Sequence, residues 1–221
     1  MVKKKTKQTK KKILKNLVKS REDKQLLGAV GVIILVFGLF LGTYFYVQSL
    51  GHFDYAGVRW EKIKEGQLEL YYSKFKLEDS PFVYNAYLRN DPRKNDILVD
   101  ANFKFNKNVL VSFEDYDPAC GGKDSYLAAV IGPFLKAMNL NATGATANKE
   151  KSEQQNITFA DCGSVNSTTS VIVVQSSDEP SIVQSNETPG CYYINVGQCK
   201  QIETVERFIV AILGQTSGEK I

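Results

Sequence analysis

The sequence is short of the side chains on which most hydrolytic and zinc chemistry depends. It contains one histidine, His52, and four cysteines that never form a C-x-x-C pair. Serine and thiol hydrolases need an imidazole that reaches the nucleophile, and structural zinc sites need closely spaced Cys and His ligands. His52 follows a long apolar stretch and has no such partner near it in sequence. These shortages exclude triad hydrolases and argue against a zinc module.

Charged residues are absent between Lys24 and Asp54, if His52 is counted as neutral. Within this interval, residues 26–47 (LLGAVGVIILVFGLFLGTYFYV) are almost wholly apolar. At about 1.5 Å per helical residue, this stretch reaches roughly 33 Å, enough to cross the hydrocarbon layer of a bilayer. The sequence therefore predicts a transmembrane helix over 26–47.

Basic residues are concentrated ahead of this helix. Residues 1–26 carry eleven Lys and Arg against Glu22 and Asp23, whereas the rest of the chain has a net charge of −5. Lysine-rich flanks stay on the cytoplasmic side, which predicts a cytoplasmic N-terminus and an external C-terminal part. A cleaved signal peptide is the alternative, but its apolar core is usually only about 7 to 15 residues long. We favour an uncleaved anchor.

This anchor divides the chain into three parts. They are a basic cytoplasmic tail (1–25), a transmembrane signal-anchor helix (26–47) and an extracytoplasmic domain (54–221). The tail places Ile13, Leu14, Leu17 and Val18 on one side of a short basic helix, a pattern typical of a segment that lies on anionic lipid. We expect the lipid bilayer, rather than nucleic acid, to be its partner.

All four cysteines follow the apolar stretch: Cys120, Cys162, Cys191 and Cys199. An even number confined to the external part predicts two disulfides in an oxidising compartment. Three pairings are open. We favour Cys120 with Cys162 and Cys191 with Cys199, because the first two would both follow strands of one sheet.

Four N-x-T sequons also lie in the second half of the chain. They begin at Asn141, Asn156, Asn166 and Asn186. Glycosylation needs an exposed asparagine in a secreted or external domain. The sequons therefore predict glycans clustered on one part of the external domain.

Alternating and turn-rich segments favour strands in the first half of this domain. The expected strands are 58–64, 68–77, 82–89, 97–105 and 109–113, joined by turns such as KEGQ and NDPRKND. Together they look like an antiparallel meander.

The second half is mixed. Apolar spacing predicts a helix over 127–138, kinked or split at Gly132 and Pro133, followed by a mobile polar loop over 139–155. Short strands are expected at 157–160, 171–175, 181–184 and 192–196, and a final helix over 201–213 stopped by Gly214. The fold class is therefore α/β in the mixed α+β sense, an antiparallel meander followed by a mixed sheet covered by two helices.

The stretch CGGKDS, Cys120 to Ser125, resembles the SGGxDS loop of ATP pyrophosphatases of the PP-loop type. In that family the loop joins a buried strand to a helix, whose N-terminus faces the phosphates. Here Cys120 replaces the leading serine, EDYDPA separates the loop from the strand, and the region is predicted to be external. We expect a Gly-Gly turn with Asp124 or Ser125 capping the helix, and no bound nucleotide or other cofactor.

Acidic residues follow two of the expected strands. Asp115 and Asp117 come after one, and Asp161 comes after another. The D-Y-D sequence is similar to the D-x-D of haloacid-dehalogenase phosphatases, although Ala119 stands where threonine or valine is usual. Carboxylates at the ends of strands could hold a divalent cation. Loop carboxylates are ordinarily solvated, so this metal site is the less favoured interpretation.

These features predict a single-pass membrane protein of the cell surface. Its disulfide-stabilised domain is expected to be a binding or structural module, with a surface protein or a glycan as partner, and not an enzyme. The alternatives are a membrane-tethered, metal-dependent hydrolase and an accessory subunit of a membrane complex. A lysine-rich anchor before a domain rich in Tyr, Asn, Ser and Thr is similar in general appearance to archaeal surface proteins, although no motif carries that resemblance.

Overall fold

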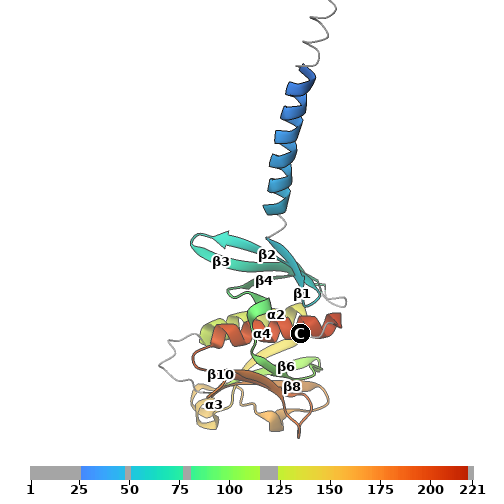
Figure 1. The fold of residues 1–221 in the computed structure, drawn as a ribbon. Coiled ribbons are helices and arrows are strands. Elements are labelled where there is room, and N and C mark those ends of the chain that lie inside the picture. The colour runs from blue at the N-terminus through green and yellow to red at the C-terminus, as the bar shows by residue number, and fades with distance from the viewer. Residues whose placement is uncertain (1–25, 48–50, 77–80, 115–123, 219–221) are drawn as a thin grey trace, which may run out of the picture. The chain divides into compact units, whose positions relative to one another are not determined.

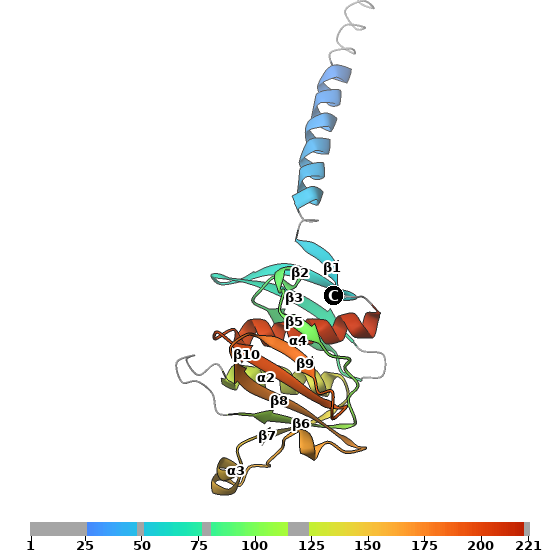
Figure 2. The same ribbon diagram turned by 60° about the horizontal axis from the view of Figure 1, so that its bottom comes forward.

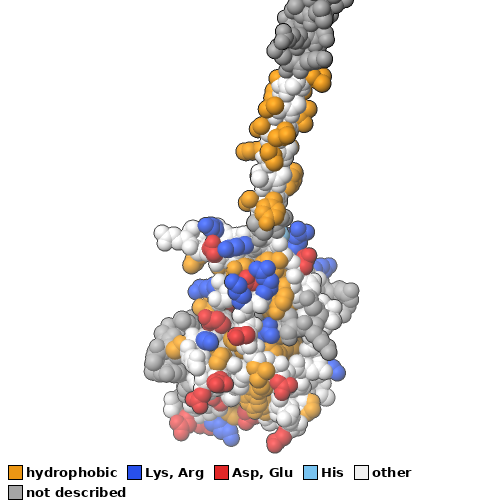
Figure 3. Space-filling view, in the orientation of Figure 1, with side chains coloured by type: hydrophobic (Ala, Val, Ile, Leu, Met, Phe, Trp, Pro, Cys, Tyr) orange, Lys and Arg blue, Asp and Glu red, His pale blue; other side chains and the backbone are white. Residues whose placement is uncertain are grey.

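The computed structural model describes residues 26–47, 51–76, 81–114 and 124–218. The chain divides into two compact units, Met1–Gly51 and His52–Ile221. The first contains the helix Leu26–Val47, whose residues are all exposed and whose mean hydropathy is 2.5. Hydrophobic side chains surround it (Figure 3). It is long and apolar enough to span a membrane, a property that a signal sequence near the N-terminus would share.

Thr43 places a hydroxyl group in this apolar helix, and the hydroxyl finds its hydrogen-bond partners within the helix. Thr43 Oγ1 lies 2.9 Å from the carbonyl oxygens of Leu39 and of Phe40, and it donates to them. A buried or lipid-facing hydroxyl without a partner would be costly in hydrocarbon. Thr43 is therefore compatible with a membrane-spanning position.

The second unit begins with a four-stranded antiparallel sheet in the order β1-β2-β3-β4. Its strands are β1 (His52–Tyr55), β2 (Val58–Glu65), β3 (Leu68–Phe75) and β4 (Tyr84–Leu88). β1 and β2 are joined by Ala56 and Gly57, which have φ values of 55° and 70°. Positive φ at both central residues is what a two-residue hairpin turn of the primed type requires. The sequence does not predict β1, whose four residues lie between the apolar helix and the first expected strand at 58 and show no clear alternation.

A mixed six-stranded sheet forms the other half of this unit, in the order β5-β9-β10-β8-β6-β7. Its strands are β5 (Leu98–Asp100), β6 (Asn108–Phe113), β7 (Asn141–Thr146), β8 (Thr169–Ser177), β9 (Ser181–Gln184) and β10 (Cys191–Gly197). The neighbours β10, β8, β6 and β7 are parallel, whereas β9 runs against β10 and β5 runs with β9. The predicted antiparallel meander of five strands is thus corrected: its last two strands belong to this second sheet.

Two helices lie between the sheets (Figure 1). They are α2 (Asp124–Ala137) and α4 (Gln201–Ser217), which contact each other. The main core combines Trp60 and Leu88 from the first sheet with fully buried residues of both helices and with the inner face of the second sheet. The coarse prediction of a mixed α+β domain is confirmed, and the helices cover one face of the mixed sheet (Figure 2).

The opposite face of the six-stranded sheet is also covered. In β8, Ile172 and Val174 point into the main core, whereas Val171 and Val173 belong to a second, smaller cluster. That cluster is closed by residues 160–165, which follow the short helix α3 (Lys149–Gln155) and include the 3₁₀ turn η3 (Cys162–Ser164). Parallel sheets are normally buried on both faces, which explains the continuous apolar run of β8.

A disulfide joins Cys162 to Cys191, with 5.4 Å between their Cα atoms. It fixes the covering segment to the first residue of β10. The favoured pairing of Cys162 with Cys120 and of Cys191 with Cys199 is therefore wrong. The reason is that residues 160–165 cross the face of the sheet and reach the amino end of β10, a path that strand order alone does not reveal.

Three further elements differ from their prediction. α2 is one helix and is not split at Pro133, and Ile131 and Phe134 on either side of this proline are fully buried. α4 runs past Gly214 and ends at Gly218, whose φ is 75°. Residues 139–155, expected to form a mobile loop, contain β7 and α3.

We predict that the second disulfide joins Cys199 to Cys120. Cys199 is disulfide-bonded, and Cys120, which lies outside the described residues, is the remaining cysteine of the four in the sequence. Mass spectrometry of peptides from the full chain, digested without reduction, should give one cross-linked pair for each bond. A peptide that joins Cys120 to Cys162 would contradict both the predicted pair and the structure.

We also predict that Gly197→Ala destabilises the domain. A Cβ atom at Gly197 would lie 2.6 Å from the carbonyl carbon of Glu179 and 2.7 Å from the nitrogen of Pro180, both of which are backbone atoms. Such overpacking costs about 1–3 kcal/mol. Denaturant unfolding followed by the fluorescence of Trp60, the single tryptophan, measures the change.

Gly144→Ala in β7 is the matched control, because a Cβ atom at Gly144 meets nothing within 4 Å. Its unfolding midpoint should stay at or slightly above that of the unmodified chain. Equal stability of the two variants would contradict the close packing of β10 against the β8–β9 connection.

Candidate functional site

The most unusual polar groups of the domain lie on α4. This helix is buried on nearly every side, and its buried residues include Glu206 and Arg207, which are 2% and 8% exposed. Charged side chains are almost never fully buried unless they are paired or hydrogen-bonded. Their partners therefore indicate which part of the structure depends on α4.

The Glu206 carboxylate holds the chain just after β4. It accepts hydrogen bonds from the backbone N–H of Arg89, from the backbone N–H of Asn90 at 3.2 Å and from Asn90 Nδ2 at 2.9 Å. Burial raises the pKa of Glu206 to about 7, although these bonds act in the opposite direction and the charge of Glu203 adds a smaller rise. Glu206 is thus a buried acid whose charge changes near neutral pH.

Two more contacts fasten the following residues to the same helix. Asn95 Nδ2 donates to the carbonyl oxygen of Glu203 at 2.7 Å, and Arg207 Nε donates to the carbonyl oxygen of Ile97 at 3.1 Å. We call residues 89–97 the α4-bound segment. It is held at three points by residues within a little more than one turn of α4, so its backbone is fixed relative to that helix.

The α4-bound segment is also ordered internally. It contains the 3₁₀ turn η1 (Pro92–Lys94), which the Asp91 side chain caps by accepting from the backbone N–H of Arg93 at 3.1 Å. The Arg93 guanidinium forms an ion pair with Asp91 at 2.7 Å and lies 3.8 Å from the centre of the Phe53 ring. The side-chain hydrogen bond from Arg93 is the main cause that lowers the pKa of Asp91. This pair neutralises Asp91 and connects the segment to β1.

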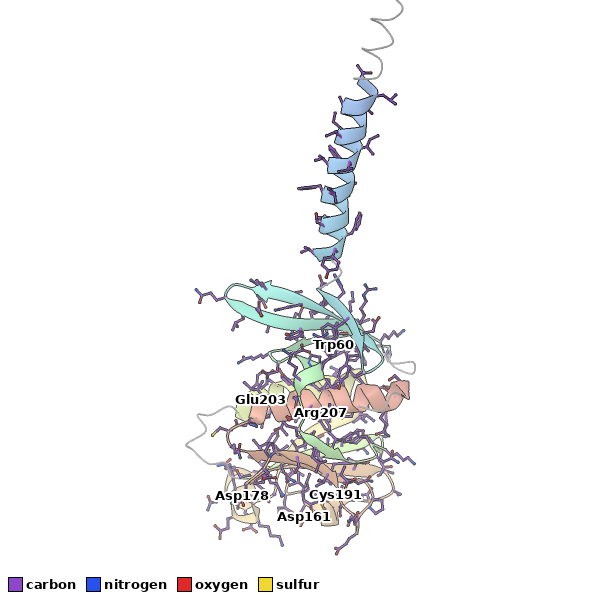
Figure 4. The ribbon with its side chains drawn as sticks, in the orientation of Figure 1. Trp60, Asp161, Asp178, Cys191, Glu203 and Arg207 are labelled. Atoms are coloured by element: carbon purple, nitrogen blue, oxygen red, sulfur yellow. A yellow bond between two sulfur atoms is a disulfide. The ribbon has the colours of Figure 1, made fainter. Side chains whose placement is uncertain are left out.

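A pocket of about 340 Å³ lies between the α4-bound segment and the first turn of α4. Seven of its eight lining residues have polar or charged side chains: Asn90, Asp91, Lys94, Asn95 and Asp96 from the segment, with Ile97, and Lys200 and Glu203 from α4. Figure 4 shows Glu203 and Arg207 on α4. The volume falls in the range of small-molecule sites.

Only one of the three residues predicted to bind a metal ion, Asp161, lies in the described part of the chain. Asp161 caps η3: its Oδ1 accepts from Ser164 Oγ at 3.4 Å, and Ser164 Oγ in turn accepts from the Asp161 N–H at 3.3 Å. It lies beyond the six-stranded sheet from α4 (Figure 4). Asp115 and Asp117 fall outside the described residues. Among the residues that are described, no group of three or more His, Cys, Asp or Glu side chains could hold a metal ion.

The CGGKDS stretch cannot be placed in full either. Residues 115–123 lie outside the described ranges, and α2 begins at Asp124. The predicted context, in which the stretch leads into a helix after a strand, is found, since β6 ends at Phe113 and α2 follows. The predicted cap by Asp124 or Ser125 stays a prediction.

All four sequon asparagines are exposed. Asn141 is the first residue of β7, and Asn166 and Asn186 precede β8 and β10, so these three lie at the amino ends of parallel strands. Asn156 ends α3 in a left-handed conformation, with a φ of 52°. Three of the four sequons therefore lie at the same end of the six-stranded sheet, where its parallel strands begin.

Sequence reasoning missed the buried charges of α4. Periodicity assigns Ile202, Val205, Ile209 and Ile212 to the apolar stripe of this helix, and it gives no sign that Glu206 and Arg207 are buried as well. The sequence does contain one indication of this burial. Glu206 and Arg207 stand between two apolar residues, Val205 and Phe208, so the helix is apolar on more than one side. Such a helix is buried all round, and its charges then need partners.

Comparisons of the chain with protein-family models, with curated proteins and with solved structures gave no significant match.

We predict that Glu206 makes the stability of the domain depend on pH. A carboxyl group whose pKa is raised by folding contributes stability that is complete below its unfolded pKa, near 4.5, and is lost as pH rises through about 7. In Glu206→Gln this contribution is absent. The difference in unfolding free energy between the two proteins should change by about 3 kcal/mol across this window, as measured by Trp60 fluorescence in denaturant.

Glu150→Gln is the control, because Glu150 is an exposed acid in the first turn of α3. This variant should follow the unmodified chain at every pH. If the Glu206→Gln protein shows the same pH dependence as the unmodified chain, Glu206 is not the group responsible.

Proposed function

We propose that this protein is a single-pass membrane protein whose N-terminus is cytoplasmic and whose domain His52–Ile221 is an external binding module. The observation that carries the proposal is the independence of the two units. The domain has a closed core of its own, and every residue of the apolar helix Leu26–Val47 is exposed. A lipid bilayer is the environment that such a helix requires.

Charge supports the orientation. Eleven basic residues lie ahead of the helix, against two acidic ones, whereas the rest of the chain is net acidic. This asymmetry favours a cytoplasmic N-terminus. The Cys162–Cys191 disulfide supports an oxidising compartment for the domain.

The positions of the sequons support an external domain that is glycosylated along one edge. Exposed asparagines at the amino ends of β7, β8 and β10 would carry their glycans away from the core without displacing a buried side chain. The pocket beside α4 is lined by no sequon asparagine. Glycans on this edge are therefore compatible with a ligand in the pocket.

Binding is favoured over catalysis by the kind of groups that line the pocket. Its rim is held in place by Glu206, Asn95 and Arg207, so it is arranged before any ligand arrives. The metal-dependent hydrolase stays an alternative that depends on Asp115, Asp117 and Asp161. It predicts an activity that requires a divalent cation and that is lost when any of the three is neutralised.

A protease-protection experiment tests the proposed topology. The full chain carries one tag at each end, and protease is added to intact cells. We expect the C-terminal tag to be digested while the N-terminal tag survives on a membrane-bound fragment, because only the domain lies outside.

The outcomes separate the alternatives. Loss of the N-terminal tag with survival of the C-terminal tag would reverse the orientation. A mature protein that lacks the N-terminal tag and leaves the membrane at high pH would indicate a cleaved signal sequence. As a control, Val36→Arg places a charge at the centre of the apolar helix, which costs about 2.5–3.5 kcal/mol on insertion scales and should reduce the membrane-bound fraction.

A further inference from the structure

β4 is an edge strand with an open side. It pairs with β3 alone, and it contains no charged residue. Natural edge strands are usually shielded by charge, by proline or by a covering segment. The edge strands β1 and β5 carry Asp54 and Asp100, and the edge strand β7 pairs through Thr146 with residues 158–160. In the described part of the chain, β4 has none of these protections.

The hairpin before β4 fixes which of its backbone groups point outward. β2 and β3 are joined by a two-residue turn, 66–67, whose flanking residues form a hydrogen-bonded pair. Bonded and non-bonded pairs alternate from there, so the backbone groups of Ala86 bond to β3 and those of Asn85 and Tyr87 point away from it. Arg89, two residues further on, points the same way, since its N–H donates to α4. Among the described residues, no hydrogen bond reaches the outward groups of Asn85 and Tyr87.

α2 runs beside this edge and presents uncharged residues next to it. β4 passes over α2 (Figure 1), and the ring centres of Tyr84 and Phe134 are 5.4 Å apart. Tyr126 of α2 contacts the guanidinium of the residue that follows β4. Ala129 and Pro133 follow Tyr126 by three and seven residues, so they lie on the same side of the helix, and both are exposed. The open edge and this side of α2 therefore form one uncharged surface.

Apolar and basic side chains frame the open edge. Val83 and Tyr87 are each 50% exposed. Arg89 follows the strand at one end, and at the other end Lys136 Nζ lies 5.8 Å from the centre of the Phe82 ring. Both cations are exposed, and neither takes part in the ion pairs found among the described residues. An occupant that is apolar in its middle and acidic at its ends would complement this edge.

We propose that the open edge of β4 binds an extended segment of a partner protein, which adds a fifth strand to the first sheet. Main-chain hydrogen bonds to Asn85 and Tyr87 would supply affinity, and the neighbouring side chains would supply selectivity. A second copy of this chain suits the edge less well. Antiparallel pairing of β4 with itself would bring the Arg89 end of one copy to the Lys136 end of the other, and like charges repel.

This inference rests on the binding role proposed above, to which it gives a surface and a kind of partner. It is independent of the membrane topology.

Selection from a phage-displayed library of random decapeptides, on the full chain in detergent, supplies the probe. Peptides that bind should be apolar in the middle and should carry more Asp and Glu than Lys and Arg. One of them is synthesised with a fluorophore, and its dissociation constant is measured by fluorescence anisotropy.

N-methylation of this peptide, one residue at a time, tests strand addition itself. Only every second N–H of an added strand faces β4. Methylation should therefore weaken binding by about tenfold at alternate residues and have little effect at the residues between them.

Asn85→Pro locates the site. The N–H of Asn85 faces outward, so proline removes no bond to β3 but blocks a strand at this edge, and binding should weaken by about tenfold or more. Asn85→Ala is the matched control. It loses the same side-chain contact, in which Asn85 Oδ1 accepts from the Tyr72 hydroxyl at 3.0 Å, but it keeps the N–H and should bind as the unmodified chain does. Denaturant unfolding followed by Trp60 fluorescence shows whether both variants are folded.

The contrary outcomes are distinct. Failure to select any peptide, methylation effects that do not alternate, or equal binding by the Asn85→Pro and Asn85→Ala proteins would overturn strand addition at β4 while leaving the proposed topology intact. A dimer in detergent that Asn85→Pro dissociates would assign the edge to a second copy and overturn the partner protein. Selection of basic peptides would overturn the acidic preference. If Asn85→Pro does not fold, the methylation series on the unmodified chain still decides.

Discussion

The structure depends on the complete burial of one helix. α4 lies between a four-stranded and a six-stranded sheet, and its residues from Thr204 to Gly214 are removed from water. A helix with one solvated face could leave its charged residues outside. α4 cannot, and so Glu206 and Arg207 must find hydrogen-bond partners within the protein. The chain provides them as backbone groups of residues 89–97.

This requirement links the two sheets. The segment that satisfies Glu206 and Arg207 is the connection between β4 of the first sheet and β5 of the second. The same connection carries Arg93, which reaches the Phe53 ring of β1. The stability of the helix, the position of the first sheet and the shape of the pocket therefore depend on one set of contacts. A change at Glu206 acts on all three together.

Much of the architecture could be read from the sequence, because it follows from local pattern. The apolar helix 26–47, the hairpin of β2 and β3, and the start of α4 all lie where composition and periodicity predict them. β7 could not be predicted in this way. Its sequence, NATGAT, has no apolar alternation, and the strand exists because β6 offers a parallel edge with six registered pairs. The pairing of Cys162 with Cys191 was missed for a similar reason, since it depends on a segment that crosses the sheet.

The pocket was the part least accessible to sequence reasoning. Lys94 and Asp96 are more than a hundred residues from Lys200 and Glu203, and exposed charges carry no periodic signal. What brings them together is the burial of α4, which draws residues 89–97 to its first turns. Of the acidic residues that sequence patterns did single out, Asp115 and Asp117 fall outside the described residues, and Asp161 precedes the 3₁₀ turn η3.

The position of β1 has a mechanical consequence for a protein held in a membrane. β1 is an edge strand, paired only with β2 through four registered residues, and it begins directly at the boundary of the two units. In the membrane-anchored form proposed above, tension between the anchor and the domain would be applied first to this strand. β2, β3 and β4 keep their own pairing without β1, but Phe53 and Tyr55 of β1 pack against the main core, and Trp60 Nε1 donates to the carbonyl oxygen of Tyr55. A pull on β1 would therefore reach the core at Trp60 directly, and the resistance of the domain to force would depend on how firmly these two side chains are held.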